Sequence, residues 1–214
     1  MSYTVRKEGI GEYTEKKSVF VGRIRRCTSE EEARAFIDEI RKKERTARHH
    51  VFAYVIGEEM PTVRYSDDGE PQGTGGLPVL NVLNQHELSN VCLVVTRFFG
   101  GILLGAPGLT RAYGKAAVEA VNSVDHWQVV EGVSFSVSLP YDIHARLKAF
   151  LDGIQVLSSE FGQDVTLNLL TTLGDEEDLM NSLTDLSGGK AEFSETKTAK
   201  YFLRRDGLLE EVKE

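Results

Sequence analysis

The stretch RYSDDGEPQGTGG, residues 64–76, combines three acidic side chains with four glycines and one proline. Asp67, Asp68 and Glu70 carry carboxylate oxygens of the kind that Mg²⁺ prefers, so a metal site is one interpretation. Turn chemistry is the other, because aspartates beside glycine form Asx turns and cap helices. The spacing is not that of an EF-hand loop, and no His–carboxylate triad accompanies it. We therefore predict a loop without a metal.

A second glycine-rich stretch, GGILLGAPGLTRAYGK (100–115), ends in a lysine and invites a nucleotide-binding interpretation. A P-loop needs four residues between its last two glycines, followed by Lys and then Ser or Thr. Here five residues separate Gly108 from Gly114, and Ala116 follows Lys115, which excludes that motif. Two interpretations remain: an anion site on free amides where Gly105–Gly108 opens a helix, or glycines that serve a tight strand-to-helix turn.

Two arginines flank the same predicted turn. Arg97 ends an apolar run and Arg111 lies in the helix that follows. A cationic pocket for phosphate groups is one interpretation of this pair. The other is that the arginines form ion pairs with Asp67, Asp68 or Glu70. The residues leave both open.

Catalytic groupings are weak in this chain. His49 and His50 are adjacent in a predicted strand and must point to opposite faces, so they cannot act on one atom. His86, His126 and His144 have no partner spacing, no serine lies in a nucleophile elbow, and neither cysteine has an activating sequence context. We predict no catalytic residue and no cofactor, and a binding protein rather than an enzyme.

The formal charge of −8 is unevenly distributed. Residues 1–130 carry 17 Lys and Arg against 17 Asp and Glu, whereas residues 131–214 carry 8 against 16. A polyanion would be repelled by the C-terminal part, so any contact with nucleic acid falls in the N-terminal part. Two basic clusters there fit either solvated ends of elements or an RNA-contacting face; they comprise Arg23, Arg25, Arg26, Arg41, Lys42, Lys43, Arg45 and Arg48.

The cellular compartment is predicted from two kinds of segment, membrane spans and signal peptides. No run of about 18 apolar residues predicts a membrane span, and the N-terminus carries charges where a signal peptide needs an apolar stretch. Cys27 and Cys92 have no metal or redox spacing and are expected to be reduced, structural thiols. We expect a cytoplasmic protein.

The elements that must hold these residues alternate along the N-terminal part. Ser29 and Glu32 form a capping box for an amphipathic helix, and Pro78 suits the first turn of a short helix. Residues 91–99 are continuously apolar, as in a buried central strand. We predict strands at 17–26, 49–57, 62–65 and 91–99, and helices at 30–44, 77–83 and 109–124.

The C-terminal part follows a simpler pattern. We predict a strand at 134–141, a helix capped by Asp142, strands near 154–160 and 164–171, a helix from Asp175 to a stop at Gly188, and a final strand at 190–205. Strand, helix, strand, strand, helix, strand is the ferredoxin-like βαββαβ order. The fold class is therefore α+β in two domains, 1–130 and 131–214.

Two runs, YSDDGEPQGTGGLPVLNVL and VVTRFFGGILLGAPGLTRAYGKA, resemble the signature of the YigZ/IMPACT family, close to SDDGEPxGTAGxPxLxxL and VVxRYFGGxxLGxGGLxRAY. The likeness covers roughly residues 17–125. It implies an N-terminal domain similar to the second domain of ribosomal protein S5, followed by the ferredoxin-like domain of bacterial members. Eukaryotic relatives are linked to regulation of translation through an additional N-terminal domain for which this chain has no room.

Three residues depart from that pattern. Phe98-Phe99 stands where the family usually has Tyr-Phe, Gly75 replaces alanine, and Pro107 replaces glycine. Because proline has no amide proton, Pro107 cannot donate to an anion at this turn.

Three hypotheses for function follow. The first is a non-enzymatic binding protein in translation or its regulation, which contacts RNA, the ribosome or a translation-machinery protein and neither a membrane nor a DNA sequence. The second is an enzyme or binder of a phosphorylated small molecule at the Asp67/Arg97/Arg111 cleft. The third is a protein-interaction module whose acidic C-terminal domain docks on a basic partner. The expected binding residues are Asp67, Asp68, Gly69, Glu70, Gln72, Gly73, Arg97, Gly100, Gly101, Gly105, Arg111 and Tyr113.

Overall fold

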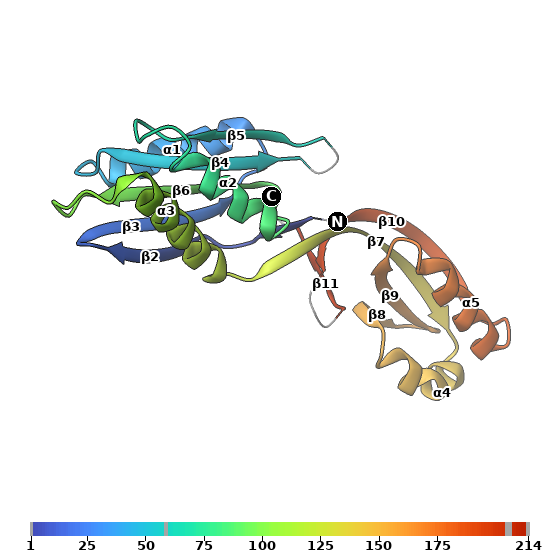
Figure 1. Cartoon of the computed structure of the whole chain (residues 1–214). Coiled ribbons are helices and arrows are strands. Elements are labelled where there is room, and N and C mark those ends of the chain that lie inside the picture. The colour runs from blue at the N-terminus through green and yellow to red at the C-terminus, as the bar shows by residue number, and fades with distance from the viewer. Residues whose placement is uncertain (1, 58–59, 204–206, 213–214) are drawn as a thin grey trace. The chain divides into compact units, whose positions relative to one another are not determined.

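The structure is a computed structural model that describes residues 2–57, 60–203 and 207–212. The chain divides into two compact units, Met1–Trp127 and Gln128–Glu214 (Figure 1). Strand β7 (His126–Leu139) runs through this division, so the expected boundary at 130/131 falls inside a strand. The architecture is mixed α/β in two units, each described below by itself.

A five-stranded antiparallel sheet forms the first unit, in the order β2-β3-β6-β4-β5. Strand β6 lies at its centre, and its first seven residues are buried. The continuous apolar run in β6 is explained by helices on both faces of the sheet. The strands are β2 (Gly9–Glu15), β3 (Ser18–Arg26), β4 (His49–Ile56), β5 (Thr62–Ser66) and β6 (Val91–Phe98).

Three helices cover this sheet. Helix α1 (Glu30–Lys43) packs on one face in a cluster with Cys27, Tyr54 and Cys92. Helices α2 (Gly76–Gln85) and α3 (Gly105–Asn122) pack on the other face in the larger core (Figure 1). The predicted N-cap is confirmed, since Ser29 Oγ accepts from the Glu32 amide at 3.2 Å. The Glu32 carboxylate accepts from the Thr28 amide at 2.7 Å, one residue before the position that a capping box uses.

Helix α3 approaches strands β2 and β3 very closely. A Cβ atom built on Gly11 would lie 2.3 Å from the Ala120 amide nitrogen, and one on Gly22 would lie 2.5 Å from the Ala116 carbonyl oxygen. No side chain fits at either glycine without moving the helix. Alanine at 116, 117 and 120 completes this small-residue contact on the helix side.

Two N-terminal strands were not predicted. Strand β1 (Tyr3–Val5) hydrogen-bonds the chain around Leu88, with Tyr3 N donating to Glu87 O at 2.8 Å. Strand β2 pairs along its full length with β3. Its exposed residues Ile10, Glu12 and Thr14 alternate with Gly9, Gly11 and Tyr13, which face α3.

The second unit follows the expected strand and helix order, with one added strand. It contains β7 from Gln128 onward, then α4 (Tyr141–Leu151), β8 (Gln155–Phe161), β9 (Val165–Thr172), α5 (Glu176–Ser187), β10 (Glu192–Leu203) and the added β11 (Leu209–Glu211). The sheet order is β11-β10-β7-β9-β8. Helices α4 and α5 and one face of the sheet form a single core around Phe135, Leu147 and Leu183.

Several predicted boundaries were wrong. Helix α4 begins at Tyr141 after Pro140, so Asp142 lies in the first turn and is not the N-cap. Helix α3 begins at Gly105, four residues before the predicted start, with Pro107 inside its first turn, where a missing amide proton costs nothing. Gly188 does end α5, in a left-handed conformation. Residues 204–205 of the predicted last strand lie outside the described residues.

Candidate functional site: a buried ionic network beneath an exposed rim

Asp67 stabilises the start of α2 from a distance along the chain. The segment 67–76, here called the acidic loop, connects β5 to α2. Asp67 Oδ1 accepts from the amides of Gly75 and Gly76, both at 2.9 Å, and Oδ2 accepts from the Gly73 amide at 2.8 Å. Burial raises the pKa of this carboxyl, but the three amides outweigh burial and the pKa is lowered. Asp67 is thus a helix-capping carboxylate.

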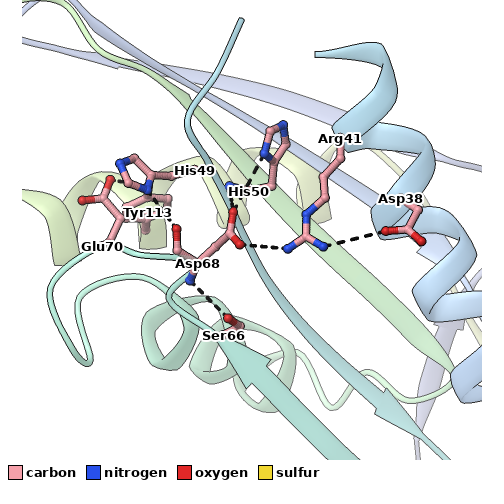
Figure 2. A network of polar contacts seen from close by, with 8 residues as sticks. All are labelled: Asp38, Arg41, His49, His50, Ser66, Asp68, Glu70 and Tyr113. Atoms are coloured by element: carbon pink, nitrogen blue, oxygen red, sulfur yellow. Dashed lines mark hydrogen bonds and ion pairs between the residues drawn. The ribbon is translucent and has the colours of Figure 1, made fainter. Parts of the chain in front are cut away.

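Asp68 ties the acidic loop to α1 and β4 (Figure 2). Its Oδ1 accepts from Arg41 Nη2 at 2.8 Å, and its Oδ2 accepts from the His50 backbone amide at 2.7 Å. The Asp68 carbonyl oxygen lies 2.9 Å from His49 Nδ1. Burial lowers the pKa of His50, against the opposing effect of Asp68. Burial therefore favours a neutral His50 side chain at this end of the sheet.

Glu70 connects the acidic loop to β6 and α3. Its Oε1 accepts from Arg97 Nη1 at 2.7 Å and from the Tyr113 hydroxyl at 2.8 Å. The side chains of Glu70 and Arg97 are only 4% and 8% exposed, and Tyr113 is fully buried. Burial raises the pKa of Tyr113 well above its ordinary value. This arrangement is an internal charge pair with a neutral phenol, so Tyr113 is not available as a base.

The sequence left two interpretations of Arg97 and Arg111 open, a cationic pocket or ion pairs with loop carboxylates, and Arg97 follows the second. Arg97 is covered by protein, is neutralised by Glu70, and lies over the rings of Phe20 and Phe99 at 5.6 and 5.4 Å. Arg111, by contrast, is exposed on α3. The expectation that a loop carboxylate holds Arg97 is confirmed. Within the residues that the structure describes, no three Asp, Glu, His or Cys side chains are grouped as metal ligands.

The segment 99–104, here called the Phe99 loop, joins β6 to α3 and is fixed at its base. The Gly100 amide donates to Ser18 Oγ at 3.1 Å. A Cβ atom on Gly100 would lie 2.0 Å from the Lys17 carbonyl carbon, so only glycine fits there. Phe99, Ile102 and Leu103 are 58%, 43% and 82% exposed. The loop therefore presents apolar side chains to solvent beside the β2–β3 turn.

The predicted site residues fall into two groups. The first is the buried ionic network, which holds the acidic loop against the sheet and α3; it comprises Asp67, Asp68, Glu70, Arg97 and Tyr113. The second is the exposed rim on the two loops and α3; it comprises Gly69, Gln72, Gly101, Gly105 and Arg111, with Gly73 and Gly100 half-buried. The network fixes the acidic loop, and the rim holds the most exposed of the predicted site residues.

Three residues of the predicted basic clusters form ion pairs within the first unit. Arg23 forms a buried ion pair with Glu44 at 2.7 Å. Arg25 contacts Glu8 and Glu39, each at 2.7 Å, and Arg41 contacts Asp68. Lys42, Lys43, Arg45 and Arg48 remain exposed at the end of α1. An RNA-contacting face in this region would therefore have fewer unpaired cations than the sequence indicates.

Two groups were missed by sequence reasoning. Lys16 and Lys17 form the turn between β2 and β3, where Lys17 lies against Gly100. The rings of His86 and His126 lie 5.5 Å apart, although 40 residues separate them. Burial and the neighbouring His126 lower the pKa of His86. The apolar side chains of Phe99, Ile102 and Leu103 are exposed in the glycine-rich segment for which the sequence suggested an anion site or a tight turn.

Known domain families match both units. Residues 16–121 match the Impact N-terminal domain, and residues 137–190 match a domain of unknown function, DUF1949. A solved structure described as a hypothetical protein covers 90% of this chain and 95% of its own, with 27% identity and a TM-score of 0.59. The two-unit architecture is therefore shared with that protein.

Relatives extend over most of the chain. IMPACT family member YvyE of Bacillus subtilis is 38% identical over 90% of this chain and 90% of its own. IMPACT family member YigZ of Escherichia coli is 31% identical over 81% and 87%. The Protein IMPACT homolog of Saccharomyces cerevisiae is 32% identical over 50% of this chain and 43% of its own. The matched domain and the first two relatives together show that the chain belongs to the IMPACT family.

Proposed function

We propose that this chain is a non-enzymatic binding protein that acts in translation or its regulation, through contacts with RNA, the ribosome or a translation-machinery protein. Family membership supports the process, since eukaryotic relatives are linked to regulation of translation. One observation favours binding over catalysis: three polar side chains of the family signature bond to each other inside the protein. Glu70, Arg97 and Tyr113 form a buried unit whose functional atoms face inward.

The contact surface in this proposal is the exposed rim. Arg111 supplies charge, Gln72 supplies an amide, and Gly69 and Gly101 leave the backbone accessible. The buried network beneath holds this surface in one shape, which lowers the ordering cost of binding.

Ribosome co-sedimentation tests this proposal. We expect the protein to sediment with ribosomes at about 50 mM salt and to be released progressively toward about 200 mM, because phosphate contacts weaken as salt rises. Arg111→Ala should weaken the association, whereas Arg146→Ala, an exposed arginine of α4, should not. Absence of association at the lower salt concentration would refute ribosome binding.

A second candidate is a binder of a phosphorylated small molecule at the start of α3. Gly105 and Ala106 are exposed there, and the N-cap residue Leu104 supplies no side-chain hydrogen bond. Free amides at a helix N-terminus favour anions. A thermal-shift screen of nucleotides and sugar phosphates should then show a stabilising ligand, and a blank screen counts against this candidate.

The finer fold assignments and the compartment belong to the same proposal. The order β10-β7-β9-β8, with α4 and α5 in one core, supports a ferredoxin-like second unit. We assign the first unit to the S5 domain 2-like class on the family likeness. Among the helices of the described residues, none is long and apolar enough to cross a membrane; a cytoplasmic location is part of the proposal.

A further inference from the structure

We propose that the Phe99 loop and the neighbouring Lys16–Lys17 turn bind an acidic, amphipathic segment of a partner protein. This inference deepens the proposed function and rests on it for the identity of the process, because it names the chemical class of the partner. Both parts lie at the same end of the five-stranded sheet, where β6 ends and β3 begins (Figure 1).

The apolar half of this surface is Phe99, Ile102 and Leu103. These three large side chains lie within five residues and are 58%, 43% and 82% exposed. Such a loop would normally be polar, and clustered exposed apolar residues mark interaction sites. The next residue, Leu104, turns inward and packs against the core of the first unit. Leu104 therefore anchors the loop to the core, whereas the three residues before it in this set remain exposed.

The position of the loop is fixed against the basic turn. Gly100 donates to Ser18 and contacts the Lys17 backbone so closely that a Cβ atom would collide with it. Val19 pairs with Phe98 in the sheet, which places the start of the loop beside the start of β3. Lys16 and Lys17 are both exposed, so their amines lie at the edge of the apolar half.

Arg111 extends the basic half onto α3. Lys115 lies 4.8 Å from the centre of the Tyr13 ring of β2. Arg111 precedes Lys115 by one helical turn, about 6 Å along the helix. Helix α3 runs opposite to β2, because Ala120 lies on Gly11. The same 6 Å covers about two strand residues, so Arg111 lies level with Glu15 and the Lys16–Lys17 turn.

These three cations are available to a partner. Among the residues that the structure describes, Lys16, Lys17 and Arg111 form no ion pair, whereas Arg23, Arg25, Arg41 and Arg97 each do. The nearby Glu15 accepts from the Tyr13 hydroxyl at 2.8 Å. The local charge is therefore positive in a chain of net charge −8. Carboxylates on a partner would complement it.

Protein suits this surface better than single-stranded RNA. RNA-binding surfaces of this kind stack bases on aromatic rings, and Phe99 offers one ring whose neighbour is the Arg97 guanidinium at 5.4 Å. Ile102 and Leu103 have no flat face for a base. Aliphatic side chains at the centre with cations at the border instead match a helix that carries leucines on one face and carboxylates beside them.

The test uses defined probes and the whole chain. A fluorescein-labelled synthetic peptide of about 18 residues, with leucines at helical i, i+3, i+4 and i+7 spacing and glutamates elsewhere, follows the groove-binding helix pattern. We expect saturable binding by fluorescence anisotropy. A peptide with lysine in place of glutamate, and one with serine in place of leucine, should not bind. A uridine oligonucleotide is the RNA probe.

Variants of the chain place the binding on this surface. Leu103→Ser should raise the Kd by about tenfold or more because it removes an apolar contact. The pair Lys16→Asn with Lys17→Asn should raise it by a similar factor because it removes two cations. Asn is chosen because both lysines have positive φ angles of 45° and 68°, which Asn tolerates. The matched controls are Leu186→Ser on α5, 49% exposed, and Lys42→Asn on α1; both should bind as the parent does.

Each outcome decides the proposal. Failure of the acidic peptide to bind, or equal binding by Leu103→Ser, overturns it, as does uridine binding that the peptide cannot displace. Unchanged far-UV circular dichroism shows that the variants are folded. Ribosome co-sedimentation in the same variants separates the two claims: association that survives Leu103→Ser, together with no peptide binding, leaves the proposed function standing and removes this inference.

Discussion

Glu70 Oε1 accepts two hydrogen bonds, one from Arg97 Nη1 at 2.7 Å and one from the Tyr113 hydroxyl at 2.8 Å. A single oxygen atom thereby connects a loop, the central strand and a helix of the first unit. All three side chains are nearly or fully buried, so solvent does not screen the contact. The acidic loop is held in place mainly by this connection and by the hydrogen bonds of Asp67 and Asp68.

Replacing Glu70 by Gln should destabilise the first unit by about 3 kcal/mol, because it leaves the buried Arg97 without a counter-charge. Tyr113→Phe should cost about 1–2 kcal/mol through the lost hydrogen bond. Because both act on the same oxygen, the double variant should cost less than the sum. Urea unfolding measures all three. Gln72→Ala, in the exposed part of the same loop, is the control and should change stability by less than about 0.5 kcal/mol.

Asp67→Asn should destabilise the protein by about 2 kcal/mol at neutral pH, since an ionised acceptor of three amides is replaced by a neutral one. The pKa of Asp67 is lowered below its ordinary 3.8. The stabilisation is therefore fully present above about pH 4 and is lost as the pH falls through the folded-state value. The difference between parent and variant, measured by urea unfolding at several pH values, should shrink below pH 4. A difference that stays constant with pH would contradict this role.

Gly100→Ala and Gly114→Ala should have opposite effects on stability. The first forces a Cβ atom to within 2.0 Å of the Lys17 backbone and should cost more than about 2 kcal/mol. The second adds a methyl group inside α3, where nothing lies within 4 Å, and should stabilise by up to about 1 kcal/mol. Thermal unfolding distinguishes them. Equal effects of the two substitutions would show that the Phe99 loop is not fixed at Gly100.

The two thiols should be inert in the folded protein. Burial raises the pKa of Cys27 to about 12 and raises that of Cys92 well above its ordinary range. At pH 8 the thiolate fraction of Cys27 is then about one in ten thousand, against about one in four for a free thiol. Alkylation with iodoacetamide should be slow in native buffer and rapid for both in urea. Fast native labelling of either cysteine would show that the α1 side of the sheet opens readily.

Local signals predicted most elements correctly. The N-cap at Ser29, the apolar run of β6 and the glycine stop at Gly188 each depend on a few neighbouring residues. The N-terminal strands were missed because β2 is stabilised by its pairing with β3 and by α3, which lies about 100 residues further along. Asp142 was assigned as a cap by type alone, but Pro140 already ends the preceding strand.

The site could be predicted only in part. Residue types correctly indicated that loop carboxylates would hold Arg97, yet nothing local distinguishes Glu70, which does so, from Asp67 and Asp68. The separation of Arg97 from Arg111 depends on which side of α3 faces the sheet. The basic-apolar surface was missed because its halves lie about 80 residues apart and meet only through Gly100 and Ser18.

The close approach of α3 to β2 and β3 limits which residues fit at Gly11 and Gly22. A side chain at Gly11 or Gly22 displaces the C-terminal half of α3. Tyr113 lies on the same helix, so a displacement of α3 would change the distance between its hydroxyl and Glu70. Side chains at Gly11 or Gly22 would thus act on the acidic loop through α3 and not by contact with the loop.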